Sequence, residues 1–153
     1  MPNITVIADT SCLIALSKVE GIELLKELYQ EVYITEEIAF EFGEPLPEWI
    51  IIESVKNKKY QQLLELYLDL GEASAIALAL EKVEVLLILD DLKGRKEAEK
   101  LGFRITGTLG ILFKAKKEGL ITELKSYIEK LNAVGFRLSS KIEEEILRKS
   151  NEN

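Results

Sequence analysis

Acidic residues follow apolar runs of the chain, at places where they could hold a divalent metal ion. Asp9 comes directly after ITVIA, and Asp90 and Asp91 come directly after VEVLLIL. Glu41 and Glu72 lie in neighbouring segments with helical spacing. Clustered carboxylates repel one another unless a cation lies among them, and hard oxygen ligands suit Mg²⁺ or Mn²⁺. These residue types favour metal-assisted chemistry, provided that the fold brings them together.

Each acid also has a purely structural interpretation. Asp9 and Asp91 could each cap the helix that follows by accepting hydrogen bonds from its free backbone N–H groups. Glu72 lies in the first turn of a predicted helix, where the helix dipole favours an anion whatever the function. Glu41 lies four residues after Glu37, so one of these two is expected to face solvent. The structural interpretations do not explain why the acids coincide at successive strand and helix ends.

Hydroxyl side chains occur at the same places. Thr10 and Ser11 follow the first apolar run, and Thr106 and Thr108 lie in ITGTLG near the last one. The glycines of ITGTLG allow close backbone approach at a helix start, where free N–H groups suit a phosphate. The alternative is an ordinary glycine-containing turn between a strand and a helix.

The charge distribution separates an acidic body from one basic segment. The net charge of −7 by itself argues against a nucleic-acid partner. Residues 91–117, however, hold eight basic and three acidic residues, and Lys93 and Arg95 lie beside the two adjacent aspartates. Metal and phosphate could therefore bind at neighbouring places. A run of lysines on an amphipathic helix is also typical of a solvated face.

The residue types that are scarce exclude several kinds of chemistry. The chain has one cysteine, Cys12, so an internal disulfide and a thiolate zinc cluster are both excluded. It has no histidine, which excludes a Ser-His-Asp triad, a Cys-His pair and an imidazole metal ligand. Catalysis here would depend on carboxylates, hydroxyls, lysines or a bound ion.

The elements that must position these residues alternate between strand and helix. Strands are predicted over 4–8, 32–34, 50–55, 83–89 and 103–106, and helices over the intervening segments and the C-terminal part. Thr35 is expected to start a helix that Gly43 ends, and Gly71 is expected to separate helices at 58–69 and 72–82. This alternation predicts an α/β fold with a parallel sheet and helices on both faces. The strand ends would then carry the acids to one edge of the sheet, where ligands bind in such folds.

Length and hydropathy predict one domain of ordinary type. The 153 residues are expected to form a single domain, 1–153, with the C-terminal helices packed on the same core. No apolar run approaches the roughly 18–20 residues that span a bilayer. The N-terminal stretch lacks the basic region of a signal peptide, so a cytoplasmic location is expected.

Four motifs together resemble the PIN-domain family. They are VIADTSCLIAL, ITEEIAFEF, GEASAIALALE and LLILDDLKGRKEAEKLGFRITGTLGIL, and with GFRLSSKIEEEIL the resemblance spans residues 5 to about 147. The chain is most similar to the prokaryotic branch of predicted ribonucleases, whose members include toxins of toxin–antitoxin pairs and are commonly homodimers. The resemblance implies a three-layer α/β/α sandwich whose acids bind Mg²⁺ or Mn²⁺ and hydrolyse RNA.

The same resemblance implies a role for each acid. Asp9 matches the first acidic position of the family, Glu41 the second and Glu72 the acid of the central helix. Asp91 matches the last acidic position, with Asp90 as its neighbour and substitute. The metal ligands would then be Asp9, Glu41, Glu72 and Asp91. Glu72 departs from the pattern, because many family toxins have an aspartate displaced from it by about one position.

The resulting hypothesis is metal-assisted hydrolysis of RNA phosphodiester bonds. Thr108 matches a small hydroxyl residue that accompanies the acids in the family, and would orient water or a phosphate oxygen. The other residues expected to bind the substrate are Thr10, Ser11, Lys93, Arg95 and Thr106. The expected partners are an RNA substrate, a small antitoxin protein and a second copy of the chain.

Two other classes of function compete with this hypothesis. The chain could be a non-catalytic PIN-fold module that binds RNA or assembles with other proteins. It could also be another Mg²⁺-dependent phosphoryl-transfer enzyme, such as a small phosphatase. The sequence contains neither a nucleophile-plus-lysine pattern nor a GxxxxGK loop, which disfavours the phosphatase.

Overall fold

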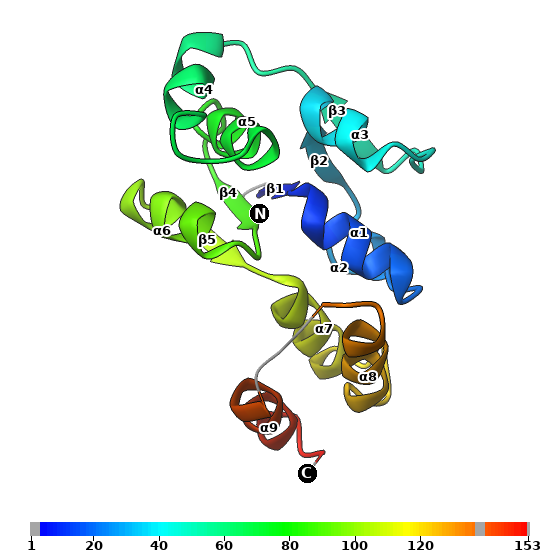
Figure 1. Cartoon of the computed structure of the whole chain (residues 1–153). Helices are drawn as coiled ribbons and strands as arrows, with labels where there is room; N and C mark the ends of the chain where they lie inside the picture. The colour runs from blue at the N-terminus through cyan, green and yellow to red at the C-terminus, as the bar shows by residue number, and fades with distance from the viewer. Residues whose placement is uncertain (1–3, 137–139, 153) are drawn as a thin grey trace.

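The computed structural model describes residues 4–136 and 140–152, and its centre is one five-stranded sheet (Figure 1). The strands are β1 (Thr5–Ala8), β2 (Val32–Thr35), β3 (Ile50–Glu53), β4 (Val85–Ile88) and β5 (Arg104–Thr106). All neighbouring strands are parallel, in the order β3-β2-β1-β4-β5. The predicted parallel sheet is therefore confirmed.

The strand order reverses at β1, and this reversal locates the crevice where a ligand would bind. The chain passes from β1 to β2 and β3 on one side of β1, then places β4 and β5 on the other. Ala8 of β1 pairs with Ile88 of β4, so both strands end side by side. In open parallel sheets, ligands bind outside the carboxyl ends of the strands at such a point. Asp9 and the acids after β4 leave the sheet there.

Helices cover both faces of the sheet and make a three-layer α/β/α sandwich. On one face, α5 (Leu70–Ala79) packs across β1, β2 and β4, with α4 (Lys58–Leu64) and α6 (Leu92–Lys100) beside it. On the other face, α1 (Thr10–Lys18), α2 (Glu23–Tyr29) and α7 (Thr108–Lys117) pack together. The helix α3 (Glu36–Phe42) contacts both α1 and α5. The predicted fold class is confirmed.

Local signals in the sequence set the ends of α3. The Thr35 hydroxyl accepts a hydrogen bond from the backbone N–H of Ile38 at 3.1 Å, which satisfies one of the free donors at the helix start. Gly43 ends the helix in the left-handed region, with φ at 72°, where glycine carries no Cβ penalty. Both predicted ends of this helix are confirmed.

The prediction that Gly71 separates two helices is wrong. The first helix ends at Leu64, and Gly71 is the second residue of α5. The start of α5 is set instead by a capping box, in which the Asp69 carboxylate accepts from the backbone N–H of Glu72 at 2.8 Å. The Glu72 carboxylate in turn accepts from the backbone N–H of Asp69 at 3.4 Å. Two backbone donors are satisfied here by side chains, so no glycine break is needed.

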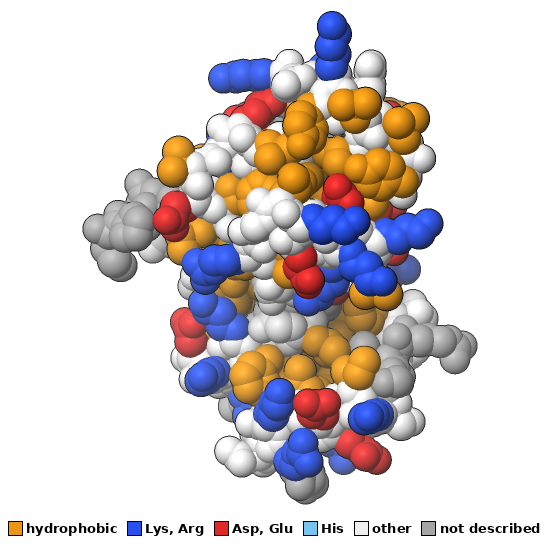
Figure 2. Space-filling view, turned by 90° about the vertical axis from the view of Figure 1, so that its left-hand side faces the viewer, with side chains coloured by type: hydrophobic (Ala, Val, Ile, Leu, Met, Phe, Trp, Pro, Cys, Tyr) orange, Lys and Arg blue, Asp and Glu red, His pale blue; other side chains and the backbone are white. Residues whose placement is uncertain are grey.

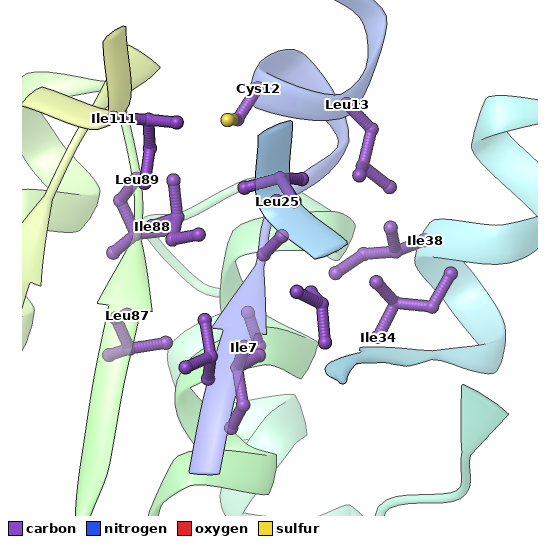
Figure 3. Close-up of a cluster of buried hydrophobic side chains, with 14 of the residues drawn as sticks. Ile7, Cys12, Leu13, Leu25, Ile34, Ile38, Leu87, Ile88, Leu89 and Ile111 are labelled. Atoms are coloured by element: carbon purple, nitrogen blue, oxygen red, sulfur yellow. The ribbon is translucent and has the colours of Figure 1, made fainter. Parts of the chain in front are cut away.

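The hydrophobic core lies on both faces of the central strands. Figure 3 shows Ile7 of β1 and Leu87 of β4 in a cluster with side chains of α1 and α3. Every residue of α5 from Gly71 to Ala79 is buried, and most of them are small. Small side chains let this helix lie close to the sheet. The helix therefore presents its N-terminus directly to the crevice.

The C-terminal helices extend the layer of α7. The helix α8 (Lys125–Ala133) buries Ile128 and Leu131, whereas α9 (Ser140–Lys149) has no fully buried residue. The sequence SSKIEEEILRK predicts the last helix from Ser139, and this first residue lies outside the described residues. The Glu152 carboxylate accepts from the backbone N–H groups of Leu124 at 2.6 Å and Lys125 at 2.9 Å. It also pairs with Lys116 of α7, so one carboxylate joins the chain's last described segment to two helices.

None of the helices in the described ranges, 4–136 and 140–152, has both the length and the apolar character required to cross a membrane.

Candidate acidic site

Asp9 is a buried carboxylate at the start of α1. It is 4% exposed, and its Oδ1 accepts from the backbone N–H of Thr10 at 2.8 Å, so it caps the helix. Burial raises the pKa of Asp9 to about 7, against the lowering effect of that hydrogen bond, and repulsion from Asp69, Glu41 and Asp90 raises it further. The helix-cap interpretation and the acidic-cluster interpretation are thus both true of this residue.

Three side-chain oxygens converge on the backbone of Gly71. A Cβ atom at this position would lie 3.0 Å from Glu41 Oε1, 3.1 Å from Asp9 Oδ1 and 3.2 Å from Thr10 Oγ1. The Thr10 hydroxyl is buried and has no hydrogen-bond partner among the described residues. Buried polar atoms normally have a partner, and the described residues supply none for this hydroxyl. The space over Gly71 is a small oxygen-lined cradle between α1, α3 and α5.

Glu72 and Asp91 form a second pair of acids beside this cradle. Glu72 is 4% exposed, and its side chain lies against α6, 3.5 to 3.7 Å from where a Cβ of Gly94 would be. Burial raises the pKa of Glu72 to about 8, and repulsion from Asp69, Asp91 and Asp9 adds to the rise, as does a hydrogen bond with Asp91. Asp91 caps α6 by accepting from the backbone N–H groups of Lys93 at 3.0 Å and Gly94 at 3.3 Å.

Asp90 points away from Asp91 and is fixed by Thr108. Its carboxylate accepts from the Thr108 backbone N–H at 2.8 Å and from the Thr108 hydroxyl at 2.6 Å. A Cβ at Gly107 would lie only 2.6 Å from Asp90 Oδ1, so the glycine leaves room for the carboxylate in this position. Asp90 is one of the charges that raise the pKa of Asp9. The two adjacent aspartates therefore serve different halves of the site, Asp90 beside Asp9 and Asp91 beside Glu72.

The predicted substrate-binding residues are distributed around the acids. Ser11 and Lys93 are exposed, and Arg95 Nη1 donates to the carbonyl of Leu89 at 3.1 Å, close to Asp90. Thr106 Oγ1 lies over the backbone of Gly110, at the start of α7. Among the described residues, Arg95 lies near Asp90, and none of the six acids Asp9, Glu41, Asp69, Glu72, Asp90 and Asp91 forms an ion pair with a lysine or arginine.

The four predicted metal ligands do not form one ligand set. Across residues 4–136 and 140–152, no three acidic or cysteine side chains lie close enough together to hold an ion. Asp9 and Glu41 share one point, whereas Glu72 and Asp91 share another. Mg²⁺ commonly binds through one or two carboxylates and keeps several water ligands. Over Gly71 the described residues offer two carboxylates and one hydroxyl, oxygen ligands of the kind a hard divalent cation takes, and any further ligands would have to be water.

Asp69 belongs to this site and was missed by sequence reasoning. It is exposed at the rim, caps α5, and raises the pKa of both Asp9 and Glu72. The spacing Asp-x-x-Glu in DLGE is a capping-box pattern, which could have identified it as the residue before α5.

The comparison with protein families agrees with the fold. The profile of a family described as a PIN domain matches residues 5–152, nearly the whole chain. The chain therefore belongs to the PIN-domain family, as the sequence motifs predicted. PIN domains are generally nucleases, so the fold is of the nuclease type. Searches among curated proteins and among solved structures gave no match.

Proposed function

We propose that the chain is an endoribonuclease that requires Mg²⁺ or Mn²⁺ and hydrolyses RNA phosphodiester bonds. The observation that carries this proposal is the convergence of the Asp9, Glu41 and Thr10 oxygens over Gly71. This point lies beside the ends of β1 and β4, where the strand order reverses. A buried carboxylate without an ion pair gains most from a bound cation.

The residues around the cradle would have different roles in such a reaction. Asp9 and Glu41 would hold the ion, and the unpartnered Thr10 hydroxyl would donate to a phosphate oxygen or orient the attacking water. When bound, the ion would lower the pKa of a water molecule and offset negative charge on the phosphate. Asp90, fixed by Thr108, would orient the water shell from the other side. No histidine is needed for this chemistry, which agrees with the composition.

The basic segment of α6 would hold the RNA backbone. Arg95 lies beside Asp90, and Lys93 and Lys96 are exposed on the same helix. Phosphate contacts of this kind bind nucleic acid without reading its sequence. Added salt should therefore weaken RNA binding while leaving metal affinity less affected.

The test is cleavage of labelled RNA with Mn²⁺, by the natural chain and by Asp9→Asn and Glu41→Gln variants. We expect each substitution to reduce the cleavage rate at least about 100-fold, because each removes a ligand charge. Glu37→Gln is the matched control, since Glu37 lies one turn from Glu41 on α3 and binds Gln61 and Lys58 instead. Cleavage that persists in Asp9→Asn, or in EDTA, would contradict the proposal.

A second candidate is a non-catalytic module that binds RNA or assembles with other proteins. It is favoured by the lack of a three-acid ligand set in the described residues and by the helix-capping roles of Asp69 and Asp91. Titration calorimetry distinguishes the two candidates. A module of this kind would bind RNA equally well with Mg²⁺ and with EDTA, and would not cleave it.

The resemblance to prokaryotic PIN toxins supports a narrower proposal, in which a small antitoxin protein controls the nuclease. Expression of the chain alone would then arrest bacterial growth, and Asp9→Asn would relieve the arrest at equal protein level. An arrest that Asp9→Asn leaves unchanged would count against a toxic nuclease.

A further inference from the structure

Large apolar side chains are exposed directly beside three acidic residues of the candidate site. The pairs are Phe40 (90% exposed) beside Glu41, Leu70 (51%) beside Asp69 and Leu92 (65%) beside Asp91. They belong to three helices, α3, α5 and α6, and α5 contacts both of the others. A single exposed apolar residue is ordinary on a protein surface, but one beside each of three acids in one site favours a ligand that all of them contact.

Phe40 is the most exposed large apolar side chain on the described helices. Its neighbour Glu41 places Oε1 in the cradle, 3.0 Å from where a Cβ of Gly71 would lie. Consecutive Cα atoms are about 3.8 Å apart, so the phenyl ring belongs to the rim of the cradle. Because so little of the ring is buried, it contributes little to the stability of the fold. The ring is therefore free to contact a ligand of the cradle.

The charges on the two sides of the cradle differ in sign. The helix α3 carries Glu36, Glu37 and Glu41 and no basic residue. Lys93 and Lys96 are exposed on α6, and Figure 2 shows a band of Lys and Arg side chains on the side of the molecule where α6 lies. Phosphates are repelled by the first helix and attracted by the second. A nucleic-acid strand across the cradle would therefore hold its backbone toward α6 and turn its bases toward α3.

A phenyl ring offers one kind of contact to a base. It has no hydrogen-bond donor or acceptor, and bases of every type stack on exposed aromatic side chains. A purine has a larger ring face than a pyrimidine, so stacking covers more apolar area and is stronger. Leu70 and Leu92 provide apolar contact but no flat face for stacking. Phe40 is therefore the side chain of this rim that can select a base.

We propose that Phe40 stacks on a purine base beside the phosphate held at the cradle, and so determines where along the strand the RNA is cut. This inference rests on the proposed ribonuclease function and adds a purine preference on one side of the cut. The purine must be unpaired, because the bases inside a duplex present no face to the ring. Phe40 would act by binding the substrate, whereas Asp9 and Glu41 would hold the ion.

The test uses labelled uridine tracts that contain one adenosine, one guanosine or no purine. Binding is measured by fluorescence anisotropy with Ca²⁺, and cleavage is measured and mapped with Mn²⁺. We expect the natural chain to bind each purine-containing tract about threefold or more tightly than the tract of uridine alone. It should also cut these tracts at one fixed position relative to the purine.

Substitutions of Phe40 separate the ring from its apolar character. Phe40→Ala should raise KM for the purine-containing tracts about tenfold and change kcat less than about twofold, because a stacking contact binds substrate and transition state alike. Phe40→Leu keeps an apolar side chain but should lose the purine preference, whereas Phe40→Trp should retain it. Val83→Ala is the matched control, since Val83 is fully exposed but lies in the bend before β4, at the other end of that strand from the site. Circular dichroism checks that each variant folds.

The outcomes distinguish this inference from the nuclease proposal. If the natural chain and Phe40→Leu cut at the same positions with the same purine preference, the inference is wrong and the nuclease function stands. A purine preference in binding that depends on Phe40, without any cleavage, would support the stacking contact and contradict the nuclease function. RNA affinity that Phe40→Ala leaves unchanged would overturn the inference and leave the exposed ring to a protein contact.

Discussion

Asp9 caps a helix and also carries a buried charge, and one substitution separates the two roles. Its pKa is about 7 in the folded chain and about 3.8 in the unfolded chain. Between these values the folded state binds more protons, so the metal-free protein loses stability as the pH rises from about 4 to 7. Asparagine caps helices as well as aspartate does. We therefore expect Asp9→Asn to stabilise the metal-free chain at pH 8 by roughly 2–4 kcal/mol.

Thermal melts in EDTA at pH 3.5 and pH 8 measure this effect. At pH 3.5 the natural chain and Asp9→Asn should melt at nearly the same temperature, because Asp9 is then largely protonated in both states. Added Mg²⁺ should raise the melting temperature of the natural chain at pH 8 and leave Asp9→Asn unchanged. An equal melting temperature of the two proteins in EDTA at both pH values would show that the Asp9 charge costs nothing.

The close contacts over Gly71 predict that a Gly71→Ala variant keeps its stability but loses activity. Alanine is a better helix former than glycine, by up to about 1 kcal/mol in a helix interior and less at the second position of α5, but its Cβ would enter the oxygen-lined cradle. We expect Gly71→Ala to change the melting temperature by less than about 4 °C and to lower metal affinity and RNA cleavage at least about tenfold. Gly94→Ala is the control, because its Cβ would meet Glu72 at an ordinary 3.5 Å. Equal activity of the two variants would argue against the cradle.

At the residue scale, the sequence predicted which acidic residues lie near the edge of the sheet. It did not predict which neighbours each acidic residue contacts. Asp9 and Glu41 could be placed because strand and helix ends are visible in the hydrophobic pattern. The different partners of Asp90 and Asp91 could not be predicted. Successive side chains of an extended segment point to opposite sides, and which side faces Thr108 depends on a strand far along the chain. That contact is set by tertiary structure.

At the scale of the elements, substitutions of Asp91, which caps α6, test whether this residue is structural, catalytic or both. Asp91→Ala removes the cap and should lower the free energy of unfolding by about 1 kcal/mol, whereas Asp91→Asn keeps it and should change stability by a few tenths. If the charge also serves the reaction, both variants lose RNA cleavage. Urea unfolding combined with the cleavage assay gives both quantities. Full cleavage by Asp91→Asn would restrict Asp91 to capping α6.

The boundary between α4 and α5 shows why some elements escape prediction. Leu63, Leu66 and Leu70 continue the helical spacing of α4 through the connection, although the helix ends at Leu64. In the sequence, these exposed leucines resemble a buried helix face, and the pattern places the break between the helices at Gly71. The spacing of apolar residues in the sequence shows their periodicity, but it does not show which of them are buried. Leucines that are exposed at helical spacing therefore mislead a prediction from the pattern.

For the whole molecule, the side chain of Glu152 should govern how the C-terminal segment is held. Its pKa is lowered to about 2, through the ion pair with Lys116 and the two backbone N–H groups from which it accepts, although burial opposes this. The stabilisation is complete above about pH 4.5 and is lost as the pH falls toward 2. We expect Glu152→Gln to lower the free energy of unfolding by roughly 1–3 kcal/mol at pH 7.

Urea unfolding at pH 7 and pH 2.5 measures that difference, with the exposed Glu144→Gln on α9 as control. The gap between Glu152→Gln and the natural chain should narrow at pH 2.5, while the control stays near the natural value at both. A gap of the same size at both pH values would assign the effect to packing instead of charge.

The sequence predicted the class of the whole fold but not its strand order. Alternating strands and helices fix a parallel sheet, since a parallel crossover needs a helix. Whether β4 lies beside β1 or beside β3 depends on which strand edges bury the apolar run 85–89, and local pattern contains no such information. The family motifs implied the three-layer α/β/α class, and the profile match over residues 5–152 agrees with that class.

The near-complete burial of α5 has a consequence for motion. A helix whose residues from Gly71 to Ala79 all lie inside the core can exchange its amide hydrogens only when much of the domain opens. Its amides should be among the slowest to take up deuterium. The floor of the cradle would then stay fixed over hours, while Glu41 and Asp69, at the exposed ends of their elements, could adjust to each arriving ligand.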